Sequence, residues 1–234
     1  LPEEKSKKRF MHNFIDRTSI KDLIESFGVP HTEVDLILVN GKSVSFEYII
    51  NDKDDISVYP VFESLDISDV QHLRPKPLRN PKFIADVHLG RLTRYLRMMG
   101  FDVYYKNDLP DEGIVKISSK ERRAILTRDI GILKRTEVTH GYFIRSDNVE
   151  KQTEEVVNRF DLQKSIKEFT RCLECNTKLT KIEKEKIINR LPPKVAVSQN
   201  EFFICPKCQK LFWKGTHHQK MLSLVQKIKT MNFS

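Results

Sequence analysis

The sequence predicts an α/β protein built from three parts: a small mixed domain, a parallel sheet flanked by helices, and a cysteine-rich metal-binding module. Strand-like and helix-period segments alternate over residues 83–160, which is the pattern of a parallel sheet with helical crossovers. A strand, a helix, a hairpin and a further strand are expected within residues 9–62. Four cysteines form two Cys-x2-Cys pairs near the C-terminus.

Charge is distributed unevenly along the 234 residues. Residues 1–75 carry 9 Lys and Arg against 14 Asp and Glu, residues 76–160 carry 17 against 12, and residues 161–234 carry 15 against 6. An acidic first third and a basic last third indicate separate modules, and a basic half suits a polyanion such as nucleic acid. No apolar run approaches the roughly 18 residues that span a bilayer. A cytoplasmic protein without a membrane partner is therefore expected.

Residues 1–70 are expected to form the first domain, with the element order of a β-grasp fold. Ser19 stands three residues before Asp22, which is a helix N-cap signature, and Gly28 is a natural helix stop. Asn40-Gly41 is a hairpin-turn signal. Because such folds open with a hairpin, the first strand is expected to be missing. The expected elements are strands at 9–15, 35–39, 44–50 and 56–62 and a helix at 19–27.

Two segments of this domain, VNGKSV and DDISVYPVF, resemble the ubiquitin-like domains of the molybdopterin-synthase small subunit and the thiamine sulphur carrier. Those carriers end in a free Gly-Gly, whereas this chain continues through Glu63-Ser64-Leu65-Asp66. A recognition or packing module, with a possible protein partner, is therefore favoured over a sulphur-relay role.

Residues 71–82, rich in proline and basic residues, are expected to be a linker, and residues 83–165 the second domain. Gly100 ends its first helix, and Asp111 and Glu112 open the next one, where acids suit the helix dipole. The expected strands are 83–86, 101–105, 124–127 and 141–145, and the expected helices are 88–99, 111–123, 130–135 and 149–160.

Three predicted strands end in an acid: Asp86, Asp129 and Asp147. Ligands of parallel sheets bind off the carboxyl ends of the strands, so these side chains are expected to meet there, and Asp111 or Glu112 could join them. Converging carboxylates suit Mg²⁺ or Mn²⁺. The alternative is that they serve as helix caps, Asp129 for the helix at 130–135 and Asp147 for that at 149–160.

Arg91, Arg94 and Arg97 follow one another at three-residue spacing, so they share one broad helical face. This stripe is either a track for a nucleic-acid backbone or the surface of an ordinary amphipathic helix.

Residues 166–234 are expected to form a zinc ribbon with a basic helix at 216–230. Its Cys-x2-Cys pairs are separated by 29 residues, and four thiolates make a structural tetrahedral zinc site without an open position. The absence of cysteines elsewhere in the chain favours metal ligation in a reducing compartment over disulfides. The expected ligands are Cys172, Cys175, Cys205 and Cys208.

Several motifs together resemble the mutator-exonuclease C-terminal RNase family, a PIN-like nuclease domain fused to a zinc ribbon. They are FIAD at 83–86, LGRL at 89–92, LTRD at 126–129, CLECN at 172–176 and FWKGTH at 212–217. In a subset of this family a ubiquitin-like domain precedes the nuclease. The resemblance implies a divalent-metal-dependent RNase in which Asp86 and Asp129 occupy the acidic positions, Asp111 or Glu112 matches the acids that open the next helix, and Asp147 matches the late polar position.

Two functions follow from these observations. The favoured one is a metal-dependent ribonuclease, in which the acids hold Mg²⁺ or Mn²⁺ and Arg91, Arg94, Arg97 and Arg128 hold phosphates. The alternative is a non-catalytic RNA-binding adaptor of tRNA or ribosomal RNA complexes. An adaptor would have no need for acids at three strand ends, since they repel phosphates.

Overall fold

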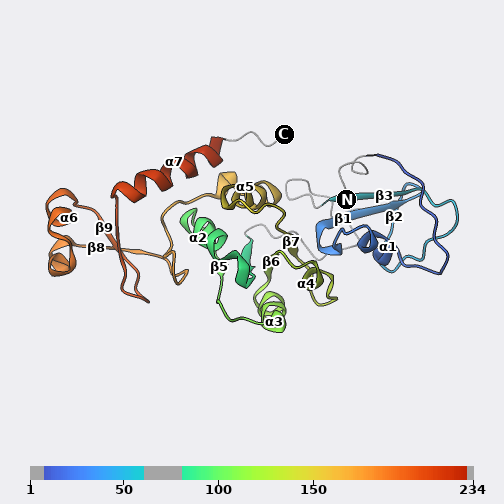
Figure 1. Cartoon of the computed structure of the whole chain (residues 1–234), viewed down its shortest axis with the longest axis horizontal. Helices are drawn as coiled ribbons and strands as arrows, with labels where there is room; N and C mark the ends of the chain where they lie inside the picture. The colour runs from blue at the N-terminus through green and yellow to red at the C-terminus, as the bar shows by residue number, and fades with distance from the viewer. Residues whose placement is uncertain (1–7, 61–80, 231–234) are drawn as a thin grey trace. The chain divides into compact units, whose positions relative to one another are not determined.

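A computed structural model describes residues 8–60 and 81–230. The chain divides into two compact units that interleave along the sequence. One contains the residues up to Pro81 together with Pro110–Phe143, and the other contains Lys82–Leu109 together with the residues from Ile144 onward. Figure 1 traces the elements of both units by residue number. In the part of the chain that is described, no helix combines the length and apolarity that crossing a membrane requires.

The first helix, α1 (Ile20–Ser26), is formed as its capping residues predict. The Ser19 hydroxyl accepts a hydrogen bond from the Asp22 backbone N–H at 3.1 Å and donates to the Asp22 carboxylate at 2.6 Å. The chain leaves the helix through Gly28, whose φ of +77° is a conformation that glycine adopts at little cost. Ile20 and Ile24 lie on the apolar face of the helix and are buried in the hydrophobic core of this part of the chain.

The helix packs on a small antiparallel sheet in the order β2-β1-β3. Its strands are β1 (Val34–Val39), β2 (Lys42–Ser43) and β3 (Ile56–Pro60), and the short helix η1 (His31–Glu33) precedes β1. Asn40 and Gly41, with φ of 51° and 79°, form the predicted hairpin turn. Buried Ile37 and Val39 of β1 join the core of α1, together with Ile50.

Two predicted strands of this domain are wrong. Residues 9–15 form no strand, because their alternation buries no apolar face: Met11 is 92% exposed and Ile15 is 99% exposed. The predicted strand at 44–50 is interrupted by a turn in which the Tyr48 N–H bonds to the Ser45 carbonyl at 3.2 Å. The end of the predicted strand at 56–62 and most of the predicted linker lie outside the described residues.

Four strands form the largest sheet, in the order β5-β4-β6-β7. Its β4–β5 and β6–β7 pairs are parallel, as predicted. The strands are β4 (Lys82–Ala85), β5 (Val103–Tyr104), β6 (Arg123–Thr127) and β7 (Gly141–Phe143). The helices between and after them are α2 (Gly90–Met98), α3 (Asp111–Glu121), α4 (Ile130–Lys134) and α5 (Val149–Arg159), and the short helix η2 (Val87–Leu89) leads into α2.

These helices flank the strands within each unit. In one unit α2 packs against α5, and in the other α3 and α4 pack on β6. The fully buried ring of Phe83 in β4 lies 5.0 Å from the ring of Phe160 and 6.5 Å from that of Phe101, centroid to centroid. Gly100, with φ of +94°, lets the chain turn from α2 into β5, and a Cβ there would collide with the Lys167 carbonyl.

The C-terminal module contains a three-stranded antiparallel sheet in the order β10-β9-β8. Ile187, Leu191 and Phe202 form its buried core, on which Trp213 packs. The closing helix has the predicted bounds, and its Val225 and Ile228 are buried. The elements are η3 (Gln163–Ser165), β8 (Thr180–Ile182), η4 (Lys184–Lys186), η5 (Ile188–Arg190), α6 (Pro193–Ser198), β9 (Phe202–Ile204), β10 (Leu211–Trp213) and α7 (Thr216–Thr230).

Candidate active site and metal centre

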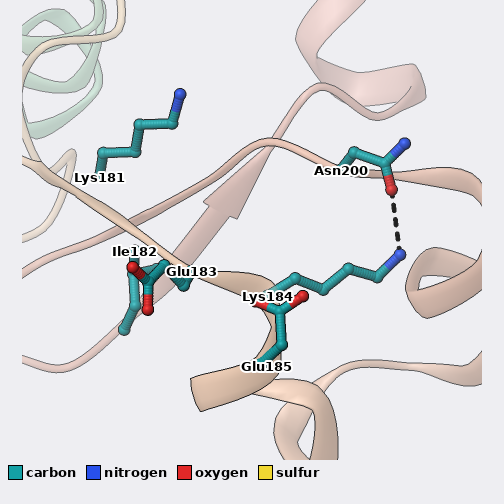
Figure 2. A pocket seen from close by; sticks show the side chains of 6 residues that line it. All are labelled: Lys181, Ile182, Glu183, Lys184, Glu185 and Asn200. Atoms are coloured by element: carbon teal, nitrogen blue, oxygen red, sulfur yellow. Dashed lines mark hydrogen bonds between the residues drawn. The ribbon is translucent and has the colours of Figure 1, made fainter.

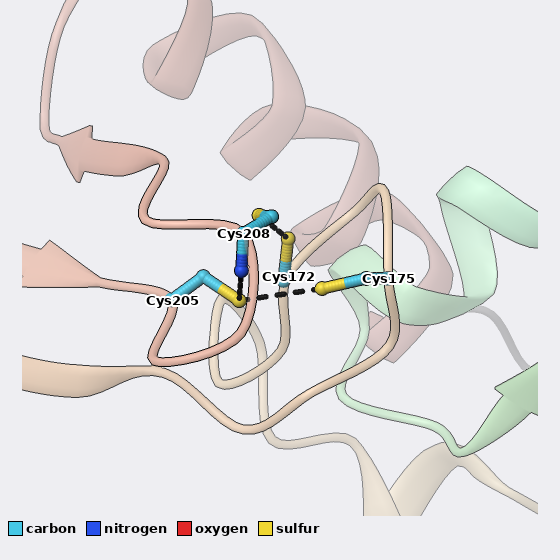
Figure 3. Close-up of side chains that lie close together, drawn as sticks. All are labelled: Cys172, Cys175, Cys205 and Cys208. Atoms are coloured by element: carbon cyan, nitrogen blue, oxygen red, sulfur yellow. Dashed lines mark hydrogen bonds between the residues drawn. The ribbon is translucent and has the colours of Figure 1, made fainter.

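The four cysteine sulfurs gather at one point between two loops (Figure 3). Sγ of Cys172 lies 3.6 Å from Sγ of Cys208, Sγ of Cys175 lies 3.3 Å from Sγ of Cys205, and all four atoms lie within 4.8 Å of one another. Zn–S bonds of about 2.3 Å in a tetrahedron place sulfurs about 3.8 Å apart. The predicted cluster is therefore assembled, and its spacing and donor chemistry fit a zinc ion held structurally.

The pKa values of the cysteine thiols differ. Burial raises the pKa of Cys172 to about 12. Burial also opposes ionisation of Cys175, but hydrogen bonds with Thr177 and Cys205 outweigh it and lower the pKa of Cys175 to about 6. Because zinc binds thiolates, the ion must displace the proton of Cys172, so acid favours its release.

Arg97 of α2 ties the first cysteine pair to the sheet. Its guanidinium donates to the Val103 carbonyl from Nε at 3.1 Å and from Nη2 at 2.8 Å. Nη1 donates to the carbonyls of Leu173 at 3.0 Å and Glu174 at 2.7 Å. Burial lowers the pKa of this guanidinium, and the negative charge of Cys172, Cys175 and Glu174 acts in the opposite direction. A zinc–tetrathiolate centre would carry net negative charge, which the buried guanidinium of Arg97 would also compensate.

Asn176 adds a second connection between the cysteine loop and the sheet. Its Oδ1 accepts from the Val103 N–H at 3.1 Å, and its Nδ2 donates to the Asp102 carboxylate at 2.8 Å. Arg171 donates to the Gly100 carbonyl at 3.0 Å and lies 3.5 Å from the Asp102 carboxylate. Sequence reasoning missed these roles. The only local signal was an arginine and an asparagine immediately flanking the first Cys-x2-Cys pair.

Asp86 stands directly after β4, as predicted, and is only 4% exposed. It precedes η2, and its carbonyl accepts from the Leu89 N–H at 2.9 Å. Its side chain makes no capping hydrogen bond to that helix. Ligands of parallel sheets bind off the carboxyl ends of the strands, so this buried carboxylate lies where a ligand site is expected.

Asp129 follows β6 and is exposed. Its Oδ1 accepts from the Gly131 N–H at 2.7 Å, so it caps α4. Its own N–H donates to the Thr127 hydroxyl at 2.9 Å. The capping alternative is therefore confirmed for this residue. The second carboxylate oxygen is not part of the cap bond, so capping leaves Asp129 able to serve as a ligand as well.

The remaining predicted acids are exposed. Asp111 and Glu112 occupy the first turn of α3, which forms despite Gly113. The alternative that Asp147 caps the next helix is wrong, because Asn148 caps α5. The Oδ1 of Asn148 accepts from the N–H groups of Glu150 at 2.9 Å and Lys151 at 3.1 Å. Among the described residues, the four cysteines are the one group of three or more metal-binding side chains close enough to share an ion.

The predicted arginine stripe is only partly exposed. Arg91 is exposed, and Arg94 is exposed and lies 3.3 Å from the Glu174 carboxylate. Arg97 is 3% exposed, so the expectation that all three share a surface face is wrong. The reason is that three backbone carbonyls, two of them in the cysteine loop, solvate its guanidinium. Arg128, after β6, is exposed.

The N-terminal domain makes specific contacts with α4 and β7 inside their common unit. The ring of His31 places Nδ1 2.7 Å from the Glu25 carboxylate and Nε2 2.9 Å from the Val138 carbonyl. Lys134 of α4 donates to the Glu25 carbonyl at 3.1 Å. These contacts join segments more than a hundred residues apart, and nothing in the local sequence pattern indicated them.

Comparison with known families gives two matches. A model described as the Mut7-C RNAse domain matches residues 81–225, and a model described as Mut7-C ubiquitin matches residues 1–66. They confirm the resemblance drawn from the motifs, including the ubiquitin-like domain that precedes the nuclease. No curated protein and no solved structure matches.

Proposed function

Because this chain belongs to the family of Mut7-C RNase domains, we propose that it is a divalent-metal-dependent ribonuclease that hydrolyses RNA phosphodiester bonds. The observation that carries the proposal is the buried carboxylate of Asp86 at the carboxyl end of β4. Ligands of parallel sheets bind off the carboxyl ends of the strands, and Asp86 stands at that end of β4.

Asp86 and Asp129 are the proposed ligands of Mg²⁺ or Mn²⁺. Both follow strands of the same sheet, and carboxylate oxygens are the donors that these ions prefer. Asp111, Glu112 and Asp147 are proposed to hold the attacking water, because no three carboxylates of the described residues lie close enough to share an ion. A divalent ion bound there would supply the positive charge that stabilises the phosphate during transfer.

The arginines have separate roles in this proposal. Arg91, Arg94 and Arg128 are exposed and would bind phosphate groups on either side of the scissile bond. The water oxygen adds to phosphorus while the bond to the leaving 3′ oxygen breaks, which yields a 5′-phosphate and a 3′-hydroxyl. Arg97 takes no part in binding RNA, because its donors are committed to backbone carbonyls. Zinc held by thiolates fits a reducing compartment, so we place the enzyme in the cytoplasm.

The test compares two aspartate variants on single-stranded RNA with Mn²⁺. Asp86→Asn is expected to abolish cleavage while zinc content and melting temperature stay close to those of the parent chain. Asp108→Asn, at an exposed turn of the same unit, is the matched control and should cleave normally. Cleavage by Asp86→Asn at the rate of the parent chain would contradict the assignment of Asp86 as a catalytic metal ligand.

A second candidate function is a non-catalytic RNA-binding adaptor. It is favoured by the finding that no three carboxylates of the described residues lie close enough to share an ion. An adaptor would bind RNA with the same affinity with and without divalent ions and would cleave nothing across Mg²⁺ and Mn²⁺. The same assay therefore separates the two functions.

A further inference from the structure

The zinc-ribbon sheet has two faces of different character. Its core face carries Ile182, Phe202 and Trp213, which pack around Ile187 and Leu191. Successive side chains of a strand point to opposite faces, so the residues between them lie on the other side. Lys181 of β8 pairs with Phe203 of β9, which pairs with Phe212 of β10. We call this cross-strand row, Lys181–Phe203–Phe212, the outer face.

The two rings of the outer face are partly accessible. Phe202, which points into the core, is fully buried, whereas its neighbour Phe203 and the adjacent Phe212 are both half-buried. Phe203 and Phe212 stand directly opposite each other in the register, so they are cross-strand neighbours on the same face of the sheet. The result is a short aromatic platform in the middle of a three-stranded sheet.

Lysines border this platform. Lys181 and Lys214 both pair with the Glu201 carboxylate, at 3.7 Å and 2.7 Å, while their side chains are 73% and 62% exposed. Two ammonium groups share one carboxylate, so the border is positive. Figure 2 shows the neighbouring hollow of 520 Å³ beside β8, where Lys184 reaches Asn200 and Lys181 points away from both. Lys181 thus lies on the outer face and also lines one side of the hollow.

We propose that the outer face binds single-stranded RNA, with bases stacked on Phe203 and Phe212 and phosphates contacted by Lys181 and Lys214. Aromatic rings on a sheet interleaved with basic side chains are how single strands are bound without strong sequence preference. The positive border argues for a polyanion and against an apolar protein partner. Duplex RNA keeps its bases stacked inside the helix, so they cannot stack on Phe203 and Phe212, and we do not expect it to bind to the outer face. The inference rests on the proposed function, since it names the surface that presents the substrate.

The test measures binding separately from cleavage. Fluorescence anisotropy of labelled oligo(rU) is recorded with the zinc-loaded full chain in buffer without Mg²⁺ or Mn²⁺. Phe203→Leu and Phe212→Leu keep the apolar volume but remove the ring, and each is expected to weaken binding about tenfold. Phe10→Leu is the matched control, because this phenylalanine is 38% exposed and lies in the N-terminal domain; it should bind like the parent.

Two further readouts locate the effect. Trp213 is the single tryptophan of the chain and adjoins Phe212, so its fluorescence should change when oligo(rU) binds. Lys181→Gln should lower the slope of log affinity against log salt by about one, as expected for one lost phosphate contact. Zinc content and melting temperature show that the variants fold.

Some outcomes overturn the proposal. It fails if the Phe203→Leu/Phe212→Leu double variant binds oligo(rU) like the parent chain, or if duplex RNA binds as tightly as the single strand. Tighter binding of oligo(dT) than of oligo(rU) also contradicts an RNA surface. If the parent chain binds as predicted but cleaves nothing, the ribonuclease proposal fails and this one stands. If the double variant cleaves RNA and binds oligo(rU) like the parent chain, the outer-face proposal fails and the ribonuclease proposal stands.

Discussion

Phe143 donates its backbone N–H to the carboxylate of Glu33 at 2.9 Å, although 110 positions separate them in the chain. Phe143 ends β7, which is one edge of the four-stranded sheet, and edge strands expose N–H groups that invite unwanted pairing. At the other edge, Val103 of β5 donates to the Asn176 side chain at 3.1 Å. The ubiquitin-like domain and the cysteine loop therefore each satisfy one edge strand of the sheet.

Removal of the Glu33 carboxylate should destabilise the unit that contains β7. Glu33→Ala leaves the Phe143 N–H without its charged acceptor, which costs about 1–3 kcal/mol. Urea unfolding should show this loss, while Glu47→Ala, at an exposed position of the same domain, should change the free energy of unfolding little. Equal stabilities of the two variants would mean that the edge contact contributes nothing.

Arg97 should be irreplaceable by lysine. The single ammonium group of lysine cannot replace the planar guanidinium, which donates hydrogen bonds to the carbonyls of Val103, Leu173 and Glu174. Arg97→Lys is expected to lose about 2–4 kcal/mol of stability, and to release zinc faster to a chelator monitored by absorbance. Arg91→Lys on the exposed side of α2 is the control and should hold zinc normally. Identical release rates would argue against a coupling of α2 to the cysteine loop.

The four thiolates should hold one zinc ion per chain. Cys205→Ser removes a buried ligand and is expected to leave the protein free of zinc, because three thiolates bind far less tightly than four. Metal analysis of the purified chains gives the stoichiometry, and circular dichroism reports the loss of the ribbon. A variant that retains a full equivalent of zinc would contradict the ligand assignment.

The parts of the fold that the sequence predicts are those that depend on neighbouring residues. The Ser19 cap, the Asn40-Gly41 turn and the bounds of α7 all follow from local chemistry. The cysteine spacing predicts the cluster for the same reason, since the metal supplies the long-range contact.

The features that the sequence did not reveal depend on distant partners. Arg97 looks like a member of a surface stripe until the carbonyls of Leu173 and Glu174, 76 and 77 positions away, are placed beside it. The alternation of residues 9–15 predicts a strand, but alternation alone cannot supply a neighbouring strand or bury Met11. For the proposed catalytic acids, the sequence identified the strand ends, and capping by Asp129 was one of the two alternatives it allowed.

His218 should stay neutral at a pH where a free histidine is half protonated. Burial lowers its pKa, aided by the charge of Lys214, and its ring packs 4.1 Å from that of Phe169. As the pH falls below about 6.5, the ordinary value, the unfolded chain takes up a proton that the folded chain resists. The stability of α7 docking should therefore fall with acid. An NMR titration of His218 that gave a pKa at or above the ordinary value would refute this.

The most direct test of the ribonuclease account is a crystal structure of the protein soaked in Mn²⁺, with the anomalous signal of manganese used to locate the ion. If the protein is a metal-dependent ribonuclease, the map should show a manganese peak bound by the carboxylates of Asp86 and Asp129, and this peak should be absent from Asp86→Asn crystals. Full occupancy of the cysteine centre by zinc with no manganese at these two acids, under conditions where RNA is bound, would contradict it and favour the adaptor.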